Sequence, residues 1–158
     1  AGTNVDIPAL TGAMEAALQA EEKHVVIDLG GDDIGAAALG RFTGAICSAG
    51  YEMLYVYNCY HPFSASPKEA FAGLTEIERA AKLRFTHIAA NPNLGEETTR
   101  ETVLRGKRFA DALARLSGLK VAFTAVKEGL QVLAGEISGA LFPVRIFLNR
   151  AGALLPAM

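Results

Sequence analysis

The fold of this chain is decided by the stretch HVVIDLGGDD at residues 24–33. Its first part is a continuous apolar run, which is typical of a parallel strand buried on both faces. The run stops at an acid, Asp28, followed closely by two glycines. Open α/β sheets bind ligands just outside the carboxyl ends of such strands. We therefore expect a strand over residues 24–30, with Asp28 at the mouth of a ligand site.

The spacing between Asp28 and Gly31 suits the chemistry of a magnesium nucleotide. A carboxylate can hold a water of the ion, and a glycine N–H can approach a terminal phosphate because no side chain stands in the way. A plainer interpretation stays open, since many buried strands end in Asp-Gly turns that only terminate the strand. The sequence also has no G-x-x-x-x-G-K-[S/T] loop, which normally cradles the phosphates.

Length and composition indicate one soluble globular domain. The 158 residues can bury a substantial core, and the net charge of −2 comes without a basic patch, so nucleic-acid binding is not expected. The longest apolar runs fall short of the roughly 20 residues that a bilayer requires, and no signal peptide opens the chain. We expect a cytoplasmic protein. Cys47 and Cys59 lack metal-like spacing and are expected to be free thiols.

Helical and strand-like segments alternate along the chain, which is typical of a mostly parallel sheet covered by helices. The expected fold is one three-layer α/β sandwich over residues 1–158, with right-handed crossovers. The expected helices are 9–21, 33–49, 67–82, 98–117 and 127–141, and the expected strands are 24–30, 51–57, 84–90, 119–125 and 144–148.

Two helix starts carry clear local signals. Ser66 is followed by Pro67 at the first helical position and by Glu69, a pattern in which hydroxyl and carboxylate satisfy each other's backbone donors. Thr98 and Glu101 form a second expected capping box. The helix that they open is expected to end at Gly118, a typical C-terminal glycine.

The order of the strand ends resembles the later two-thirds of a P-loop ATPase of the deviant-Walker group, the MinD/ParA and CobQ/CobB-like family. The resemblance rests on VVIDLGG at 25–31, on the strand-to-loop segment ending at Asn58, on FTHIAAN at 85–91 and on VAFT at 121–124. It covers about residues 20–149.

The resemblance implies ATP and Mg²⁺ as cofactors. Asp28 would then hold a water of the Mg²⁺, while Gly31, beside Gly30, would meet the γ-phosphate. Asn91 would read the adenine edge, because its amide oxygen can accept from the exocyclic amine while its nitrogen donates to the ring. Residues 127–128 would lie near the base, unless they only start a helix.

The strand and loop that carry the phosphate cradle in this family are absent. We therefore expect the C-terminal portion of a longer ATP-binding domain, inactive alone, from a parent protein that dimerises with ATP. Whether that parent is an ATPase stays open. Loss of an interior strand would leave two unpaired strand edges.

Two alternatives stay open. The first is a non-catalytic α/β interaction module that forms a homodimer without nucleotide. The second is a thiolate–imidazole pair from Cys59 and His61, against a plain reading as a loop that covers the sheet end. We expect His24 and His87, which lie in or beside apolar strands, to be core or edge residues rather than ligands.

Overall fold

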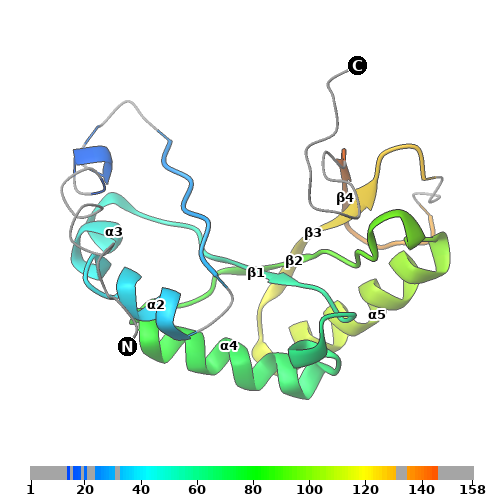
Figure 1. Cartoon of the computed structure of the whole chain (residues 1–158), viewed down its shortest axis with the longest axis horizontal. Helices are drawn as coiled ribbons and strands as arrows, with labels where there is room; N and C mark the ends of the chain where they lie inside the picture. The colour runs from blue at the N-terminus through cyan, green and yellow to red at the C-terminus, as the bar shows by residue number, and fades with distance from the viewer. Residues whose placement is uncertain are drawn as a thin grey trace, which may run out of the picture. The chain divides into compact units, whose positions relative to one another are not determined.

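The structure is a computed structural model that describes residues 14, 16–18, 20, 24–30, 33–130 and 135–145. The chain divides into two units, which are described here one at a time. Unit 1 comprises Ala1–Glu52 and Leu74–Arg84, and unit 2 comprises Met53–Gly73 and Phe85–Met158. Figure 1 labels the helices and strands of both units.

Unit 2 is built on a four-stranded sheet in which every neighbouring pair of strands is parallel, with the order β1-β2-β3-β4. The prediction of an α/β protein with a mostly parallel sheet is confirmed. The register between β2 and β3 shifts by one residue after Ile88. The strands are β1 (Leu54–Tyr57), β2 (His87–Ala90), β3 (Lys120–Lys127) and β4 (Ala140–Val144).

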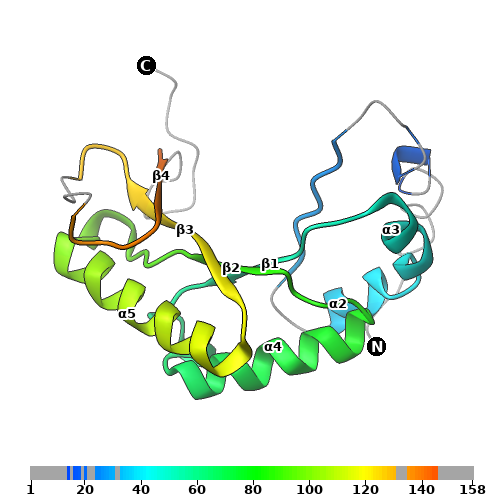
Figure 2. The same cartoon turned by 180° about the vertical axis from the view of Figure 1, so that it is seen from behind.

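Two helices connect the first three strands. Helix α4 (Pro67–Ala81) follows β1 and α5 (Arg100–Ser117) follows β2, and Figure 2 shows α5 beside the sheet. Both helices contribute to one buried cluster, so they cover the same face of the sheet in unit 2. The cluster contains Tyr57, Cys59, Ile88 and Ala90 near the sheet, Ala70 of α4, and Ala110 and Leu113 of α5.

The opposite face of this sheet is apolar and partly open. Val56 is 61% exposed and Phe142 is 54% exposed, and the Phe142 ring lies 5.1 Å from that of Phe123. Among the described residues of unit 2, no helix packs on this face. The described part of unit 2 thus has two layers, and the predicted third layer is not shown.

Helix α4 confirms the predicted helix over 67–82 and its capping box. The Ser66 N–H donates to Glu69 Oε2 (2.9 Å), and the Glu69 N–H donates to Ser66 Oγ (3.2 Å). Helix α5 ends as predicted at Gly118, whose φ of 75° lies in the left-handed region that glycine adopts without strain.

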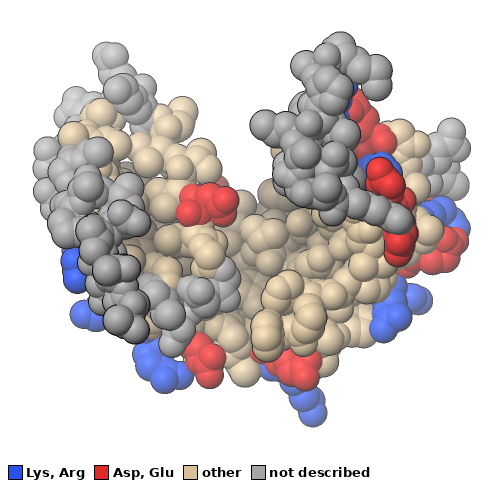
Figure 3. Space-filling view, viewed as in Figure 1, with Lys and Arg blue, Asp and Glu red and all other residues tan. Residues whose placement is uncertain are grey.

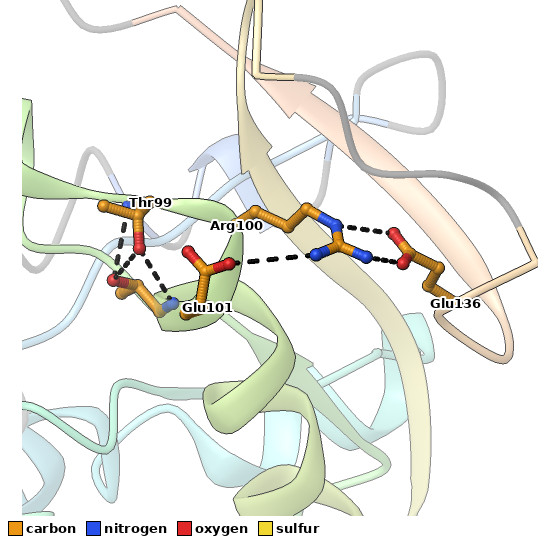
Figure 4. A network of polar contacts seen from close by, with 5 residues as sticks. Thr99, Arg100, Glu101 and Glu136 are labelled. Carbon is orange, nitrogen blue, oxygen red and sulfur yellow. Dashed lines mark hydrogen bonds and ion pairs between the residues drawn. The ribbon is translucent and has the colours of Figure 1, made fainter.

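The predicted capping box at the start of α5 is one residue early. Thr99, not Thr98, is the cap, and its hydroxyl accepts a hydrogen bond from the Thr102 N–H (3.3 Å), while Thr102 Oγ1 accepts from the Thr99 N–H (3.2 Å). Figure 4 shows this pair at the helix start. Thr98 serves the preceding loop, since its hydroxyl accepts from the Leu94 N–H (2.8 Å).

The predicted helix over 127–141 is wrong. Strand β3 continues to Lys127, where the Leu130 N–H donates to the Lys127 carbonyl and closes a turn around Gly129, whose φ is 82°. Residues 135–139 form turns and bends, and β4 begins at 140. Glycines in the turns disfavour a helix here. The last strand lies earlier than the predicted range 144–148: β4 shares only Val144 with that range, residue 145 is not in a strand, and residues 146–148 lie outside the described residues.

Unit 1 contains two short helices, α2 (Asp33–Leu39) and α3 (Thr43–Ala49), where a single helix over 33–49 was expected. The break is stabilised by Thr43, whose hydroxyl lies 3.0 Å from the Gly40 carbonyl and 2.9 Å from the Ala81 carbonyl. Of the predicted helix 9–21, residues 14 and 16–18 are helical. Residue 20 is described and is not helical, and the other residues of the predicted range lie outside the described residues.

The predicted strand over 24–30 is wrong as well. All seven residues are described, and none belongs to a strand. Val26 is 92% exposed and Val25 is 39% exposed. A strand requires a neighbour for its backbone N–H and C=O groups, and among the described residues no strand pairs with this segment.

Candidate functional site

The carboxyl ends of the four parallel strands meet along one edge of the unit 2 sheet, where open α/β sheets bind ligands. Polar residues follow these ends. Asn58 comes directly after β1, Asn91 directly after β2, and Lys127 is the last residue of β3. This edge is therefore the part of unit 2 where a ligand site is expected.

A small hollow of about 30 Å³ opens at this edge between the ends of β2, β3 and β4. It has room for about one or two waters, whereas sites for whole ligands measure roughly 300–1,000 Å³. As it stands, the hollow can receive only one edge of a larger ligand. It is lined by Asn91, Pro92, Asn93, Thr98, Ala125, Val126, Lys127 and Val144.

Asn91 presents a free side-chain amide to this hollow. Its backbone N–H donates to the Tyr57 carbonyl (2.8 Å), which extends the pairing of β1 and β2 and positions the residue. The side chain is half-buried, and in the described part of the chain its amide makes no hydrogen bond. An amide supplies one acceptor oxygen and two donor hydrogens, so Asn91 can recognise a planar group that carries a donor beside an acceptor.

The neighbouring asparagines, Asn58 and Asn93, form hydrogen bonds within the protein instead. Asn58 Nδ2 donates to the Asn93 carbonyl (2.9 Å), and Asn58 Oδ1 accepts from the Tyr60 N–H (3.1 Å). Asn93 Oδ1 accepts from the Gly95 N–H (2.8 Å). These bonds join the loops after β1 and β2 and hold them in place. Asn91 therefore differs from Asn58 and Asn93, because its amide is left available.

Lys127 adds a positive charge to the hollow. It is half-buried, and its ammonium group forms no ion pair with any described residue. The following residue, Glu128, is exposed and uses its backbone N–H to bond the Val144 carbonyl (2.9 Å). The predicted location of residues 127–128 at a helix start is wrong, since Lys127 ends a strand.

The face drawn in Figure 3 shows no broad basic patch among its described residues. There, Lys and Arg side chains lie singly or in small groups next to acidic ones.

Helix α5 supports the loop that carries Asn91. Gly106 of α5 faces Pro92, and a methyl group on Gly106 would overlap the Pro92 ring. The sequence analysis did not single out this contact, although a glycine inside a helix is itself a signal of close packing.

Ion pairs also join α5 to the segment before β4. Figure 4 shows the Arg100 guanidinium reaching Glu136, with a hydrogen bond of 2.9 Å from Nε to Oε2. Further along α5, the buried Lys107 holds both oxygens of Asp111 and the Ser138 hydroxyl. These contacts hold the segment before β4 against α5.

Asp28 and Gly30, the predicted metal and nucleotide residues, belong to unit 1, whereas Asn91 belongs to unit 2. The structure thus describes two separate groups of predicted site residues. Asp28 is exposed, and no described cation pairs with its carboxylate. Gly30 is exposed, and Gly31 lies outside the described residues. No group of three or more His, Cys, Asp or Glu side chains with the spacing of a metal site occurs among the described residues.

The thiolate–imidazole alternative finds no support in the geometry. Cys59 is 7% exposed and packs in the core, and burial raises the pKa of its thiol, which opposes formation of a thiolate. His61 is exposed, and its ring lies 5.7 Å from that of Phe63. Cys47 is exposed on α3, and both cysteines are free thiols, as predicted.

Comparisons of the chain with protein-family models, with curated proteins and with solved structures found no match. In the part of the chain that the structure describes, no helix is both long and apolar enough to span a bilayer.

Proposed function

We propose that this chain forms the base-recognition part of an adenine-nucleotide site of the MinD/ParA type, with Asn91 reading the base. The role of Asp28 as a Mg²⁺ ligand, which the same resemblance implies, is a separate proposal with its own test. One observation carries the assignment: at the carboxyl end of an interior strand, Asn91 offers an amide that has no hydrogen-bond partner among the described residues, whereas the side chains of Asn58 and Asn93 are hydrogen-bonded. The adenine edge, with an exocyclic amine beside a ring nitrogen, matches that amide.

The chain supplies little to hold the phosphates. Its sequence has no phosphate loop, and phosphoryl transfer depends on positioning and charge stabilisation of the γ-phosphate. We infer that the chain binds the base weakly by itself and has no turnover. Hydrolysis by a parent protein would require a Gly-rich loop from a further segment, with Asp28 then acting on the metal.

The test uses the ¹⁵N-labelled full chain and NMR, which detects weak binding at the Asn91 side-chain amide. Adenosine and ATP are both expected to shift this signal, because both carry the base that is recognised, and ATP is expected to bind more tightly because Lys127 can meet its phosphates. Inosine, which carries an oxygen in place of the amine, is expected to bind more weakly by roughly tenfold or more. Equal binding of adenosine and inosine contradicts the assignment.

Two variants refine this experiment. Asn91→Leu preserves volume but removes the amide, so it is expected to abolish the preference for adenosine over inosine. Lys127→Met removes the charge at the carboxyl end of β3, whereas the control Lys120→Met removes one at the amino end of the same strand, where the side chain is exposed. Only Lys127→Met is expected to weaken binding of ATP.

The metal assignment is tested separately with Mn²⁺ as a paramagnetic probe. Mn²⁺ is expected to broaden the signals of residues next to Asp28, and Asp28→Asn is expected to remove that broadening, because the carboxylate is the ligand that a hard cation prefers. Broadening that is unchanged in Asp28→Asn contradicts the role of Asp28.

The alternative of a self-associating module has one observation in its favour. Strand β1 lies at an edge of the sheet, and no described strand pairs with its free side.

A further inference from the structure

A second cavity, which shares no residue with the hollow at the sheet edge, lies at the end of helix α4 in unit 1. Its volume is about 420 Å³, which is within the range of sites that hold small molecules. All of its lining residues belong to one continuous segment of unit 1, so its geometry does not depend on unit 2. We call it the basic depression; its lining residues are Thr75, Glu78, Arg79, Lys82, Leu83 and Arg84.

The basic depression carries more positive than negative charge. Three of its side chains are cations, and Glu78 is its single acid. Thr75, Glu78, Arg79 and Lys82 have the spacing i, i+3, i+4 and i+7, which places them on one face of a helix. Arg79 and Lys82 are exposed and form no ion pair with any described residue. Both cations are therefore available to an anion that enters from solvent.

The third cation, Arg84, is held in place. Its guanidinium is bonded to Glu78 Oε2 (2.5 Å), and 84% of the Arg84 side chain is exposed. The Arg84 backbone is fixed as well, because its N–H donates to the Tyr51 hydroxyl (3.1 Å). A guanidinium has five N–H donors, so Arg84 can bind a further anion without losing its bond to Glu78.

Lys82 occupies a position where glycine would be preferred. It directly follows α4, and its φ of 56° is the only left-handed value among the described residues other than glycine. Helices commonly end on glycine in this conformation, as α5 does at Gly118, because a Cβ is disfavoured there. A residue with a side chain in this conformation costs stability, which is typical of residues at ligand sites.

We propose that the basic depression binds a small molecule through a phosphate group, with Arg79 and Lys82 as the principal contacts and Arg84 as the third cation. Guanidinium and ammonium groups form short, charge-assisted hydrogen bonds with phosphate oxygens. A phosphate group fits better than a carboxylate, because its larger charge and three acceptor oxygens can engage three cations at once. The site contains neither Asn91 nor Asp28, so this inference is independent of the proposed function.

The test titrates the ¹⁵N-labelled full chain with inorganic phosphate and follows the backbone signals by NMR. The ionic strength is kept constant, which separates binding from general screening of charge. The signals of Lys82 and Arg84 are expected to shift and to saturate. Acetate, which carries a single carboxylate, is expected to bind at least about tenfold more weakly. Shifts that rise without saturation, or equal binding of acetate, overturn the inference.

Lys82→Gly separates the charge from the fold. Glycine adopts a left-handed φ without strain, so the melting temperature is expected not to fall, whereas phosphate is expected to bind at least about tenfold more weakly. Arg79→Gln keeps a helix-forming side chain and is also expected to weaken binding. The control Lys68→Met removes an exposed cation from the first turn of the same helix and is expected to bind phosphate like the parent chain. Unchanged binding by Lys82→Gly, or an equal loss in Lys68→Met, overturns the inference.

Discussion

The buried Lys107 allows a prediction about how α5 holds the last strands of the sheet. Its ammonium group lies 2.6 and 2.7 Å from the two carboxylate oxygens of Asp111, and 3.2 Å from the Ser138 hydroxyl. All three of its donors are used. Lys107 is 6% exposed, whereas 36% of the Asp111 side chain is exposed. The two partners of this ion pair therefore depend on it to different extents.

The magnitudes follow from this asymmetry. Asp111→Ala leaves a buried ammonium group without its counter-charge, and such a loss lowers the free energy of unfolding by about 3–5 kcal/mol. Lys107→Met retains most of the apolar stem and leaves a carboxylate that water can reach, so the expected loss is about 1–2 kcal/mol. The double variant is expected to recover much of the loss of Asp111→Ala, because replacing both partners of a buried pair with apolar groups is often nearly neutral.

Urea unfolding followed by far-ultraviolet circular dichroism measures these differences. Lys68→Met is the control, since Lys68 is exposed on α4 and forms no ion pair with a described residue; it is expected to change stability by less than about 0.5 kcal/mol. The reasoning is refuted if Lys107→Met is as destabilising as Asp111→Ala, or if the double variant is no more stable than Asp111→Ala.

Three further predictions concern the core and the site. Tyr57→Phe is expected to raise the free energy of unfolding in urea by about 1 kcal/mol, because the buried Tyr57 hydroxyl has no hydrogen-bond partner among the described residues, whereas Tyr60→Phe loses a hydrogen bond and is expected to lower it by a similar amount. Burial raises the pKa of Tyr57 in the folded protein, so the free energy of unfolding falls as the pH rises above the ordinary tyrosine pKa of about 10, where the unfolded chain begins to lose this proton. In thermal melts, the melting temperature of Tyr57→Phe is expected to fall less at alkaline pH than that of the parent chain. Gly106→Ala is expected to lower both the melting temperature and adenosine binding by displacing Pro92, whereas Gly73→Ala, in the interior of α4 with space for a methyl group, is expected to leave binding unchanged.

Features that depend on a few neighbouring residues could be predicted from the sequence. The start of α4 needs only Ser66, Pro67 and Glu69, whose mutual hydrogen bonds form within one turn. The end of α5 needs only the left-handed conformation of Gly118. Such signals do not depend on the rest of the fold, and the structure shows both as predicted.

Predictions failed where two local solutions were close in energy. Thr98 and Thr99 can each cap a helix, and the loop before α5 decides between them by using the Thr98 hydroxyl for the Leu94 N–H. The apolar periodicity after Lys127 resembled a helix, but the glycines allow turns, and the pairing of β3 with β4 uses the backbone instead. In each case, tertiary contacts override a local preference.

The candidate site could be predicted in part. Asn91 is identifiable because it follows a strand that lies inside a parallel sheet, and the structure confirms that position. That its amide is free, while those of Asn58 and Asn93 are engaged, depends on loop contacts that sequence patterns do not encode. The ion pair between Lys107 and Asp111 could also be predicted, since the two residues have the spacing that brings helical side chains together.

Residues 24–29 show why composition alone does not make a strand. A continuous β-branched run predicts that a segment can be buried in a sheet, but a strand forms only when a neighbour pairs with its backbone. The same reasoning applies to β1, whose apolar residues indicate pairing on both sides although β2 is its only neighbour among the described strands.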